Sequence, residues 1–351
     1  MEFRAARRSE RDAVLDLLAL WYNEREFFAR YNQLDPAFRD DLCLVALDAG
    51  SLVGTVQIFD RKVNFAGQAV PMGGIGSVFV REDYRHRGVA SDLMRLALGT
   101  MEREGFELSL LFAERLTFYN QFGWREVTRN FSILSAAASL PAPERMEIDV
   151  FEPARDFDTV ARIHRDYSGR FNVTAARNEA DWKGSLAFAG NVPEQGCDEY
   201  FVLAREAGRI RAYARAFRFY GVAMVMEYGY EQGNEGAILA LLRNVSEAAS
   251  GTQSSLPLTG DHRKRALLQG ESRAGAASVI VTHTQHDLTL EDALSAAGCE
   301  PVRYPDNNYM WRVLLPERLG KRFAMAPEAV SEYAFSVFGD SRSLYWTADR
   351  F

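Results

Sequence analysis

The stretch that decides the fold runs from Gly76 to Ser91 and reads GSVFVREDYRHRGVAS. Its β-branched and aromatic start predicts a strand that ends near Val80. A helix is expected to begin at about Gly88 and to stop at Gly105, because apolar residues recur at helical spacing between them. The residues on this apolar face are Val89, Leu93, Leu96, Ala97, Thr100 and Met101. The pattern is therefore strand, turn and helix.

The turn between this strand and helix has the chemistry of an anion site. The first backbone N–H groups of a helix have no partner inside it, and the helix dipole adds partial positive charge there. Gly88 lets a phosphate approach the backbone, while Arg85 and Arg87 add guanidinium groups that suit phosphate geometry. Together they predict a pyrophosphate site. The short motif alone leaves open an ordinary turn with two solvated arginines.

A second element follows this helix. Residues 107–112 are expected to form a strand, and the aromatic sequence TFYNQFGW follows over residues 117–124. Tyr119 places a phenol near the predicted anion site, and a phenol in a favourable environment can protonate a thiolate. The alternative interpretation is that Tyr119 is a packing residue on a short helix. The anion turn and the phenol together suggest an enzyme that uses coenzyme A.

Residues 71–127 resemble the core of the GNAT superfamily of acyl-CoA N-acyltransferases. Residues 85–90 match its R/Q-x-x-G-x-G/A signature, and residues 118–124 match its F-Y-x-x-x-G-F/Y element, with Trp124 in the last position. The resemblance implies that acetyl-CoA is the co-substrate and that Tyr119 is the general acid. It also implies that the turn holds the pyrophosphate and that the preceding strand pairs with the pantetheine arm. The cofactor-binding residues implied are Val78, Phe79, Val80, Arg85, His86, Arg87, Gly88, Val89, Ala90 and Ser91.

Length and composition limit the class of protein. The 351 residues are too many for one ordinary core, so two or three domains are expected, and 47% hydrophobic with 25% charged residues is a globular balance. No apolar run suits a membrane span and the N-terminus lacks a signal segment, so a cytoplasmic protein is expected. The three distant cysteines show no metal spacing. A net charge of −7 argues against a nucleic-acid partner and is compatible with a cationic substrate.

The order of predicted elements repeats after a linker at residues 136–144, which suggests a diverged internal duplication. The second turn, around residues 232–237, carries no arginine, and Glu231 and Glu235 would repel a phosphate. We therefore predict an α/β (α+β) fold of two tandem GNAT-like domains, each a mixed, mostly antiparallel sheet flanked by helices. The predicted bounds are 1–138 for the catalytic domain, 139–320 for the degenerate domain and 321–351 for a short C-terminal extension.

The tandem arrangement resembles the enhanced intracellular survival acetyltransferase family, although the C-terminal extension is short for it. In that family the terminal carboxylate is thought to be the base, so the resemblance nominates Phe351 as catalytic. The alternative is a frayed terminus. The aromatic residues Tyr345 and Trp346 argue against it, because such a tail is poorly suited to water. The resemblance also allows a homo-oligomer. The sequence HTQHD at residues 283–287 is expected to be a loop, and no metal is expected.

The resulting functional hypothesis is an acetyl-CoA-dependent N-acetyltransferase. The acceptor would be a primary amine of an aminoglycoside, a polyamine or a lysine, attacking the thioester directly. Two alternatives stay open at this point. One is a transferase with another acyl donor, either a longer acyl-CoA or an aminoacyl-tRNA. The other is a sensor that binds acyl-CoA without turnover.

Overall fold

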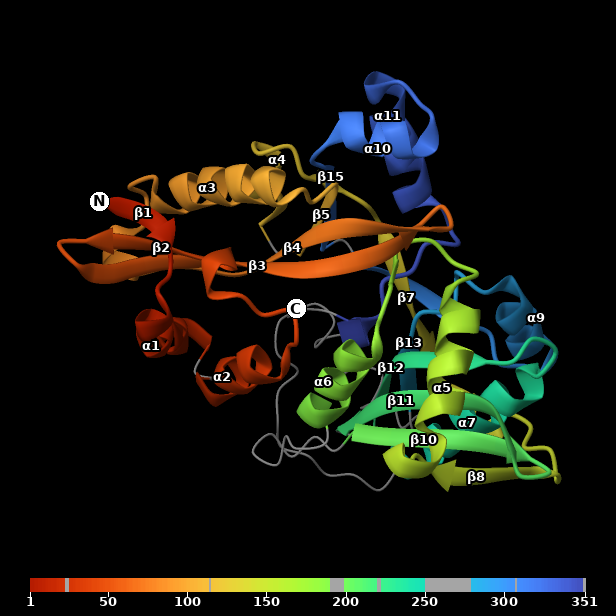
Figure 1. The fold of residues 1–351 in the computed structure, drawn as a ribbon. Helices are drawn as coiled ribbons and strands as arrows, with labels where there is room; N and C mark the ends of the chain where they lie inside the picture. Colours follow the sequence, from red (N-terminus) through yellow and green to blue (C-terminus); the bar gives the residue numbers. More distant parts are fainter. Residues whose placement is uncertain are drawn as a thin grey trace.

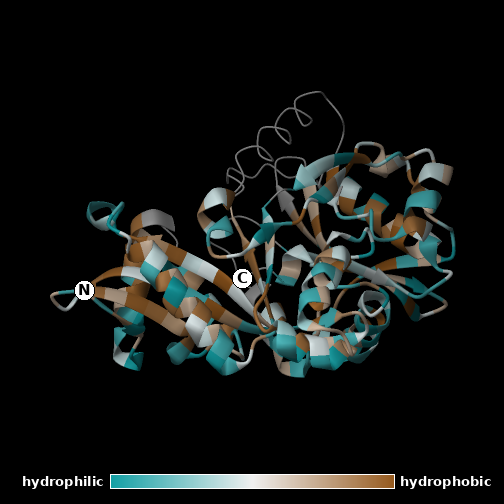
Figure 2. Cartoon of the chain, turned by 90° about the horizontal axis from the view of Figure 1, so that it is seen from above, coloured by the Kyte–Doolittle hydropathy of each residue, from teal (hydrophilic) through white to brown (hydrophobic). Residues whose placement is uncertain are grey.

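The computed structural model shows two lobes, each built on one β-sheet flanked by helices (Figure 1). The structure describes residues 1–22, 25–113, 115–189, 199–219, 222–249, 279–306 and 308–349. The predicted mixed α/β class is confirmed. In Figure 2 hydrophobic residues concentrate on the strands, which form the centre of each lobe.

The first lobe holds an eight-stranded sheet in the order β1-β2-β3-β4-β5-β15-β6, with β9 paired to β3. Among the described strands of this sheet, only β4 and β5 pair in parallel. Its strands are β1 (Glu2–Ala5), β2 (Cys43–Asp48), β3 (Ser51–Phe65), β4 (Gln68–Val80), β5 (Leu108–Phe112), β6 (Arg125–Glu126), β9 (Thr174–Ala175) and β15 (Tyr309–Val313). Its helices are α1 (Arg11–Tyr22), α2 (Arg25–Leu34), α3 (Val89–Glu104) and α4 (Leu116–Asn120).

The second lobe repeats this plan with a seven-stranded sheet in the order β8-β10-β11-β12-β13-β7-β14. In the part of this lobe that the structure describes, β12–β13 is again the single parallel pair. Its strands are β7 (Arg129–Leu134), β8 (Met146–Val150), β10 (Glu199–Glu206), β11 (Arg209–Phe219), β12 (Val222–Tyr230), β13 (Val279–Thr282) and β14 (Val302–Asp306). Its helices are α5 (Pro153–Ser168), α6 (Glu179–Ala189), α7 (Glu235–Ala249) and α9 (Leu288–Ala296). Thus α7 follows β12 as α3 follows β4, which agrees with a duplication.

The two sheets share strands across the chain order: β9 and β15 join the first sheet, and β7 joins the second. Strand β15 comes late in the chain yet lies between β5 and β6, while β7 lies between β13 and β14 of the other sheet. The sheets therefore do not divide at residue 138, because β7 precedes that position and pairs in the second sheet. This exchange ties the lobes together through backbone hydrogen bonds rather than through side chains alone.

The C-terminal segment closes the fold. Helices α10 (Pro316–Phe323) and α11 (Pro327–Gly339) cover part of the first sheet through an apolar cluster that includes Phe65, Trp311 and Phe338. A 3₁₀ turn, η6 (Thr347–Asp349), ends the described chain. Leu344, Tyr345 and Trp346 are all buried.

Candidate functional site

Strands β4 and β5 separate at the centre of the first sheet. They pair in parallel from Met72–Leu108 to Ile75–Leu111, after which β4 continues to Val80 while β5 ends at Phe112. Within the described residues, the segment Gly76–Val80 therefore has a strand partner on its β3 side only. Its other edge offers backbone N–H and C=O groups to an extended ligand.

A β-bulge shapes this open edge. Thr55 lies opposite Phe79 and Gln57 opposite Gly76, so Ser77 and Val78 together face one residue of β3. Ser77 takes a positive φ of 49°, which bends the strand at this point. Val78 and Val80 pack toward α3, while Phe79 points to the other face of the sheet. The three residues predicted to meet the pantetheine arm therefore lie along the open edge.

The turn after β4 presents the start of α3 to solvent. Gly88 caps the helix with φ of 83° and His86 has φ of 61°, so both adopt the left-handed conformation. A Cβ placed on Gly88 would meet no atom within 4 Å, which shows open space above the helix start. The backbone N–H of Asp92 already bonds to the carbonyl of Gly88. The N–H groups of Val89, Ala90 and Ser91 precede it and have no acceptor inside the helix.

Tyr84 organises the arginines around this turn. The guanidinium carbons of Arg81 and Arg87 lie 5.1 and 5.0 Å from the centre of its ring. Its hydroxyl donates to Asp48 at 3.0 Å, and this bond to a carboxylate raises the pKa of the tyrosine. Arg81 pairs with Asp83, whereas no carboxylate of the described residues lies within 4 Å of Arg87. The charge of Arg87 is therefore available beside the helix start, where the ring of Tyr84 holds the guanidinium. No motif in the sequence indicated this role of Tyr84.

Tyr119 lies on the short helix α4, against the same apolar cluster as the turn. This cluster also contains Val78, Val80 and Val89, so the predicted acid and the predicted cofactor residues share one core. The ring of Phe118 meets that of Tyr119 edge to face, with centroids 4.9 Å apart. Tyr119 is half-buried, which is compatible both with packing and with a hydroxyl that reaches the opening beside β4.

The C-terminal tail lies next to the same opening. The ring of Tyr345 is 6.1 Å from that of Phe112, the last residue of β5. A frayed terminus is therefore the wrong interpretation for residues 343–349, which are held between the lobes. Phe351, the predicted base, lies outside the described residues.

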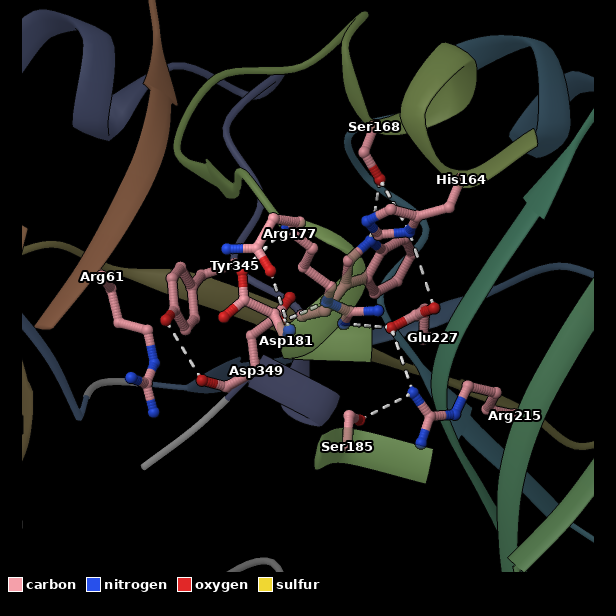
Figure 3. Close-up of polar contacts among 12 residues, drawn as sticks. Arg61, His164, Ser168, Arg177, Asp181, Ser185, Arg215, Glu227, Tyr345 and Asp349 are labelled. Atoms are coloured by element: carbon pink, nitrogen blue, oxygen red, sulfur yellow. Dashed lines mark hydrogen bonds and ion pairs between the residues drawn. The ribbon is translucent and has the colours of Figure 1, made fainter. Parts of the chain in front are cut away.

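A buried ionic cluster holds the tail, and the sequence analysis missed it (Figure 3). Arg177 bonds through Nε to Asp349 Oδ1 at 2.7 Å and through Nη2 to Glu227 on β12. Tyr213 donates to Glu227 at 3.0 Å, and Arg215 lies 3.9 Å from the same carboxylate. The one sequence signal for this cluster is a glutamate within the otherwise apolar strand VAMVMEYGY.

Burial sets the protonation states in this cluster. Burial disfavours a charged Glu227, but the neighbouring positive charges, Arg177 foremost, outweigh it and hold the pKa of Glu227 below its ordinary value. Burial raises the pKa of Asp349, opposed by Arg177. Burial, with the charge of Arg177, lowers the pKa of His164 to about 3, so its ring is neutral. Glu227 and Arg177 therefore form a charged pair within the second lobe.

The described residues contain no group of histidine, cysteine, aspartate and glutamate side chains arranged to hold a metal ion. None of the helices described has both the length and the apolar character needed to cross a bilayer. His283–Asp287 forms the connection between β13 and α9, where Asp287 caps α9 by accepting from the N–H of Leu290.

Comparison with protein families matches the first lobe. Residues 2–127 match the model of the acetyltransferase (GNAT) domain. The chain is 29% identical to an uncharacterized N-acetyltransferase of Streptomyces coelicolor over 179 residues. These residues are 48% of this chain and 42% of the relative, so the alignment spans less than half of the relative's length.

Solved structures resemble the chain over both lobes. A probable N-acyltransferase of Enterococcus faecalis superposes with a TM-score of 0.67 at 17% identity, covering 91% of this chain and 74% of the other. Eis1 of Mycobacterium abscessus superposes with a TM-score of 0.56 at 14% identity, covering 90% and 74%. At these identities the likeness shows that the fold is shared.

Proposed function

We propose, from the premise that residues 2–127 form a GNAT acetyltransferase domain, that this protein transfers an acetyl group from acetyl-CoA to a primary amine. The observation that carries the proposal is the open edge of β4 leading directly into a glycine-capped helix start. The open edge of β4 fits the extended pantetheine arm, and the helix start fits the pyrophosphate to which that arm is attached. In the proposed complex both ends of the cofactor are bound by backbone groups.

The proposed cofactor contacts follow the chain. The backbone from Gly76 to Val80 pairs with the pantetheine amides, and the N–H groups from His86 to Ser91 bind the pyrophosphate. Arg85 and Arg87 add positive charge at the same place, with Arg87 held against Tyr84. Gly88 keeps the approach clear, because it carries no side chain and adopts the left-handed conformation without strain.

In the proposed chemical step a neutral amine attacks the thioester carbonyl, and its N–C bond forms as the carbonyl electrons move to oxygen. Backbone N–H groups of the open edge stabilise that oxyanion. When the carbonyl re-forms, the C–S bond breaks and Tyr119 donates its proton to the thiolate. The nitrogen's excess proton passes to a base, for which the terminal carboxylate of Phe351 is our candidate because the tail runs beside β5.

The acceptor is proposed to be an aminoglycoside, a polyamine or a lysine side chain. A net charge of −7 favours cationic acceptors over nucleic acid. The tandem arrangement with an anchored tail supports membership of the enhanced intracellular survival type, and the superposition with Eis1 of Mycobacterium abscessus covers both lobes. A cytoplasmic location and a homo-oligomer remain part of the same proposal.

The test is release of free thiol from acetyl-CoA in the presence of a panel of amines from the three classes. Tyr119→Phe should lower kcat by about 10²-fold while coenzyme A affinity, measured by calorimetry, stays unchanged. Tyr333→Phe is the matched control, since Tyr333 lies on α11 away from the cofactor opening. Binding without thiol release for any amine would instead identify a sensor. Release only from longer acyl-CoA, or binding of aminoacyl-tRNA, would identify another donor.

A further inference from the structure

The second lobe contains a counterpart of the cofactor opening. Strands β12 and β13 pair in parallel from Val222–Val279 to Met224–Val281, and β12 then runs on to Tyr230 while β13 ends at Thr282. The two strands therefore separate as β4 and β5 do, at the same place in the strand order.

Side chains of the protein itself fill it. Trp346 of the tail is fully buried there, with its ring 5.0 Å from Tyr228 of β12 and 5.4 Å from His286, which follows β13. Its Nε1 donates to Ser168 Oγ at 3.3 Å. The ring of Tyr167 on α5 lies nearly parallel to that of Trp346, with 6.5 Å between the centroids. The tail is thus inserted where the first lobe remains open.

Ionic contacts hold the same tail to the same strand. Arg177 bridges Glu227 of β12 and Asp349 of the tail, and its guanidinium also lies 4.6 Å from the ring of Trp182. Arg177 and Glu227 side chains are 4% and 0% exposed. Among the described residues, Arg177 is the only ion-pair partner of Asp349. A buried charge of this kind needs its partner, because the lone charge is strongly disfavoured.

The other side of the tail meets the first lobe. Leu344 donates its N–H to the carbonyl of Asn172 at 2.8 Å, in the connection that leads into β9 of the first sheet. Within the tail, Tyr345 donates its hydroxyl to the carbonyl of Asp349 at 3.1 Å. The Tyr345 ring also contacts Phe112 at the end of β5. The tail therefore contacts both places where parallel strands diverge, the filled one between β12 and β13 and the open one between β4 and β5.

We propose that the second lobe is a dock for the chain's own C-terminal segment, with Arg177 as the anchoring residue and Trp346 as the inserted group. This docking positions the tail beside the acyl-transfer site, a consequence that rests on the proposed function. Arg177 is a positioning residue, since it acts on the site through Asp349. The second lobe then contributes to the reaction although its own turn carries no arginine for a cofactor.

The experiment compares two ion-paired arginines of the second lobe in the full chain. Arg177→Met removes the anchor, whereas Arg205→Met removes a pair with Asp156 that is 14% and 1% exposed and lies outside the cluster of Glu227. Hydrogen exchange of residues 343–349 is the first readout and needs no activity. In Arg177→Met exchange should be at least about tenfold faster, and in Arg205→Met the tail should stay protected. Equal protection in both variants, or equal loss, would overturn the proposal.

Kinetics give the second readout. With the amine acceptor found by thiol release, Arg177→Met should lower kcat/KM for the amine by about tenfold or more while the affinity for acetyl-CoA stays constant. Asp349→Asn is a milder variant that tests the same contact if Arg177→Met does not fold. It should accelerate hydrogen exchange of the tail by a smaller factor than Arg177→Met. If the tail is released but no amine is ever acetylated, the dock stands and the proposed function fails. If Asp349→Asn leaves both exchange and kinetics unchanged, the anchor is wrong.

Discussion

The turns that open α3 and α7 each contain a left-handed glycine and have opposite chemistry. Gly88 and Gly233 have φ of 83° and 80°, and neither has an atom near the position of a Cβ. In the first lobe the glycine is followed by free helix N–H groups beside Arg87. In the second, the N–H of Gly233 donates to Glu235 at 3.3 Å, so the chain supplies its own anion. We therefore expect a phosphate at the first turn, where the donors and charges are left available, and none at the second.

The second turn is also held by a further acidic residue. Glu231 pairs with Arg162 and Arg211 at 2.7 and 2.8 Å, so the arginines of this region are already neutralised. The lobes thus differ in where their charges are used. In the first lobe Arg87 lies at the helix start against Tyr84, whereas in the second lobe the arginines are paired with Glu231 and with the buried Glu227.

The largest expected effect comes from breaking the buried cluster. Glu227→Gln would leave Arg177 and Arg215 in the interior without a full counter-charge, and should lower the free energy of unfolding by about 3–5 kcal/mol. Urea denaturation measures it. The control in the first lobe is Arg95→Met. Arg95 and its partner Asp92 are both well exposed, so this variant should change the free energy of unfolding by less than about 1 kcal/mol. Similar losses in the two variants would remove the contrast between the lobes.

Acid should destabilise the protein through the second lobe. Burial holds the pKa of His164 at about 3, so the folded chain binds no proton there while the unfolded chain does so below about pH 6.5. Stability is thus fully present above pH 6.5 and falls by about 1.4 kcal/mol per pH unit between pH 6.5 and 3. The buried His286, whose pKa is lowered by burial first and nearby positive charges second, adds to the same slope.

Urea midpoints at pH 7.5, 6.5 and 5.5 test this dependence, with His164→Gln as the comparison. Between pH 6.5 and 5.5 the free energy of unfolding of the variant should fall less steeply with decreasing pH than that of the wild type. The difference in slope should correspond to about one proton, whatever the stability of the variant at pH 7.5. An unchanged slope would mean that His164 is not kept neutral by its surroundings.

The sequence predicted the first of these two turns because its determinants are local. Val80, Gly88 and Gly105 mark a strand end, a helix start and a helix stop within thirty residues, and α3 begins and ends where expected. The repeated order of elements also gave the fold class. Tyr119 falls on a short helix against the same core, although its proton transfer stays a prediction.

The exchanged strands and the buried cluster depend on distant pairing. Neither β7 nor β15 carries a pattern that distinguishes pairing with its own lobe from pairing with the other, because alternation specifies a face and not a neighbour. Arg177 lies 50 residues from Glu227 and 172 from Asp349, so no local motif could relate them. The aromatic tail indicated burial, but only the three-dimensional structure shows that Trp346 enters the second lobe.

A matched pair of glycine variants measures the turns themselves. Gly88→Ala and Gly233→Ala introduce the same left-handed strain and should each cost about 1 kcal/mol of stability. Only Gly88→Ala should weaken coenzyme A binding, by about tenfold, since its methyl group would occupy the space that a phosphate needs. Calorimetric titration of both variants checks the difference, and equal affinities would place the phosphate elsewhere.

The smallest expected effect comes from reopening the second turn. The double variant Glu231→Gln, Glu235→Ala removes two carboxylates at the start of α7. Glu235 accepts from the N–H of Gly233, and Glu231 neutralises Arg211. Without them, backbone donors and a positive charge become available there, as they are at Gly88. Binding should nevertheless stay at one coenzyme A per chain by calorimetry, because the separation between β12 and β13 is still filled by Trp346 and Tyr228. A phosphate site without an open strand edge holds only one end of the cofactor. Uptake of a second equivalent would show that charge alone separates the lobes and that the inserted tail does not exclude the ligand.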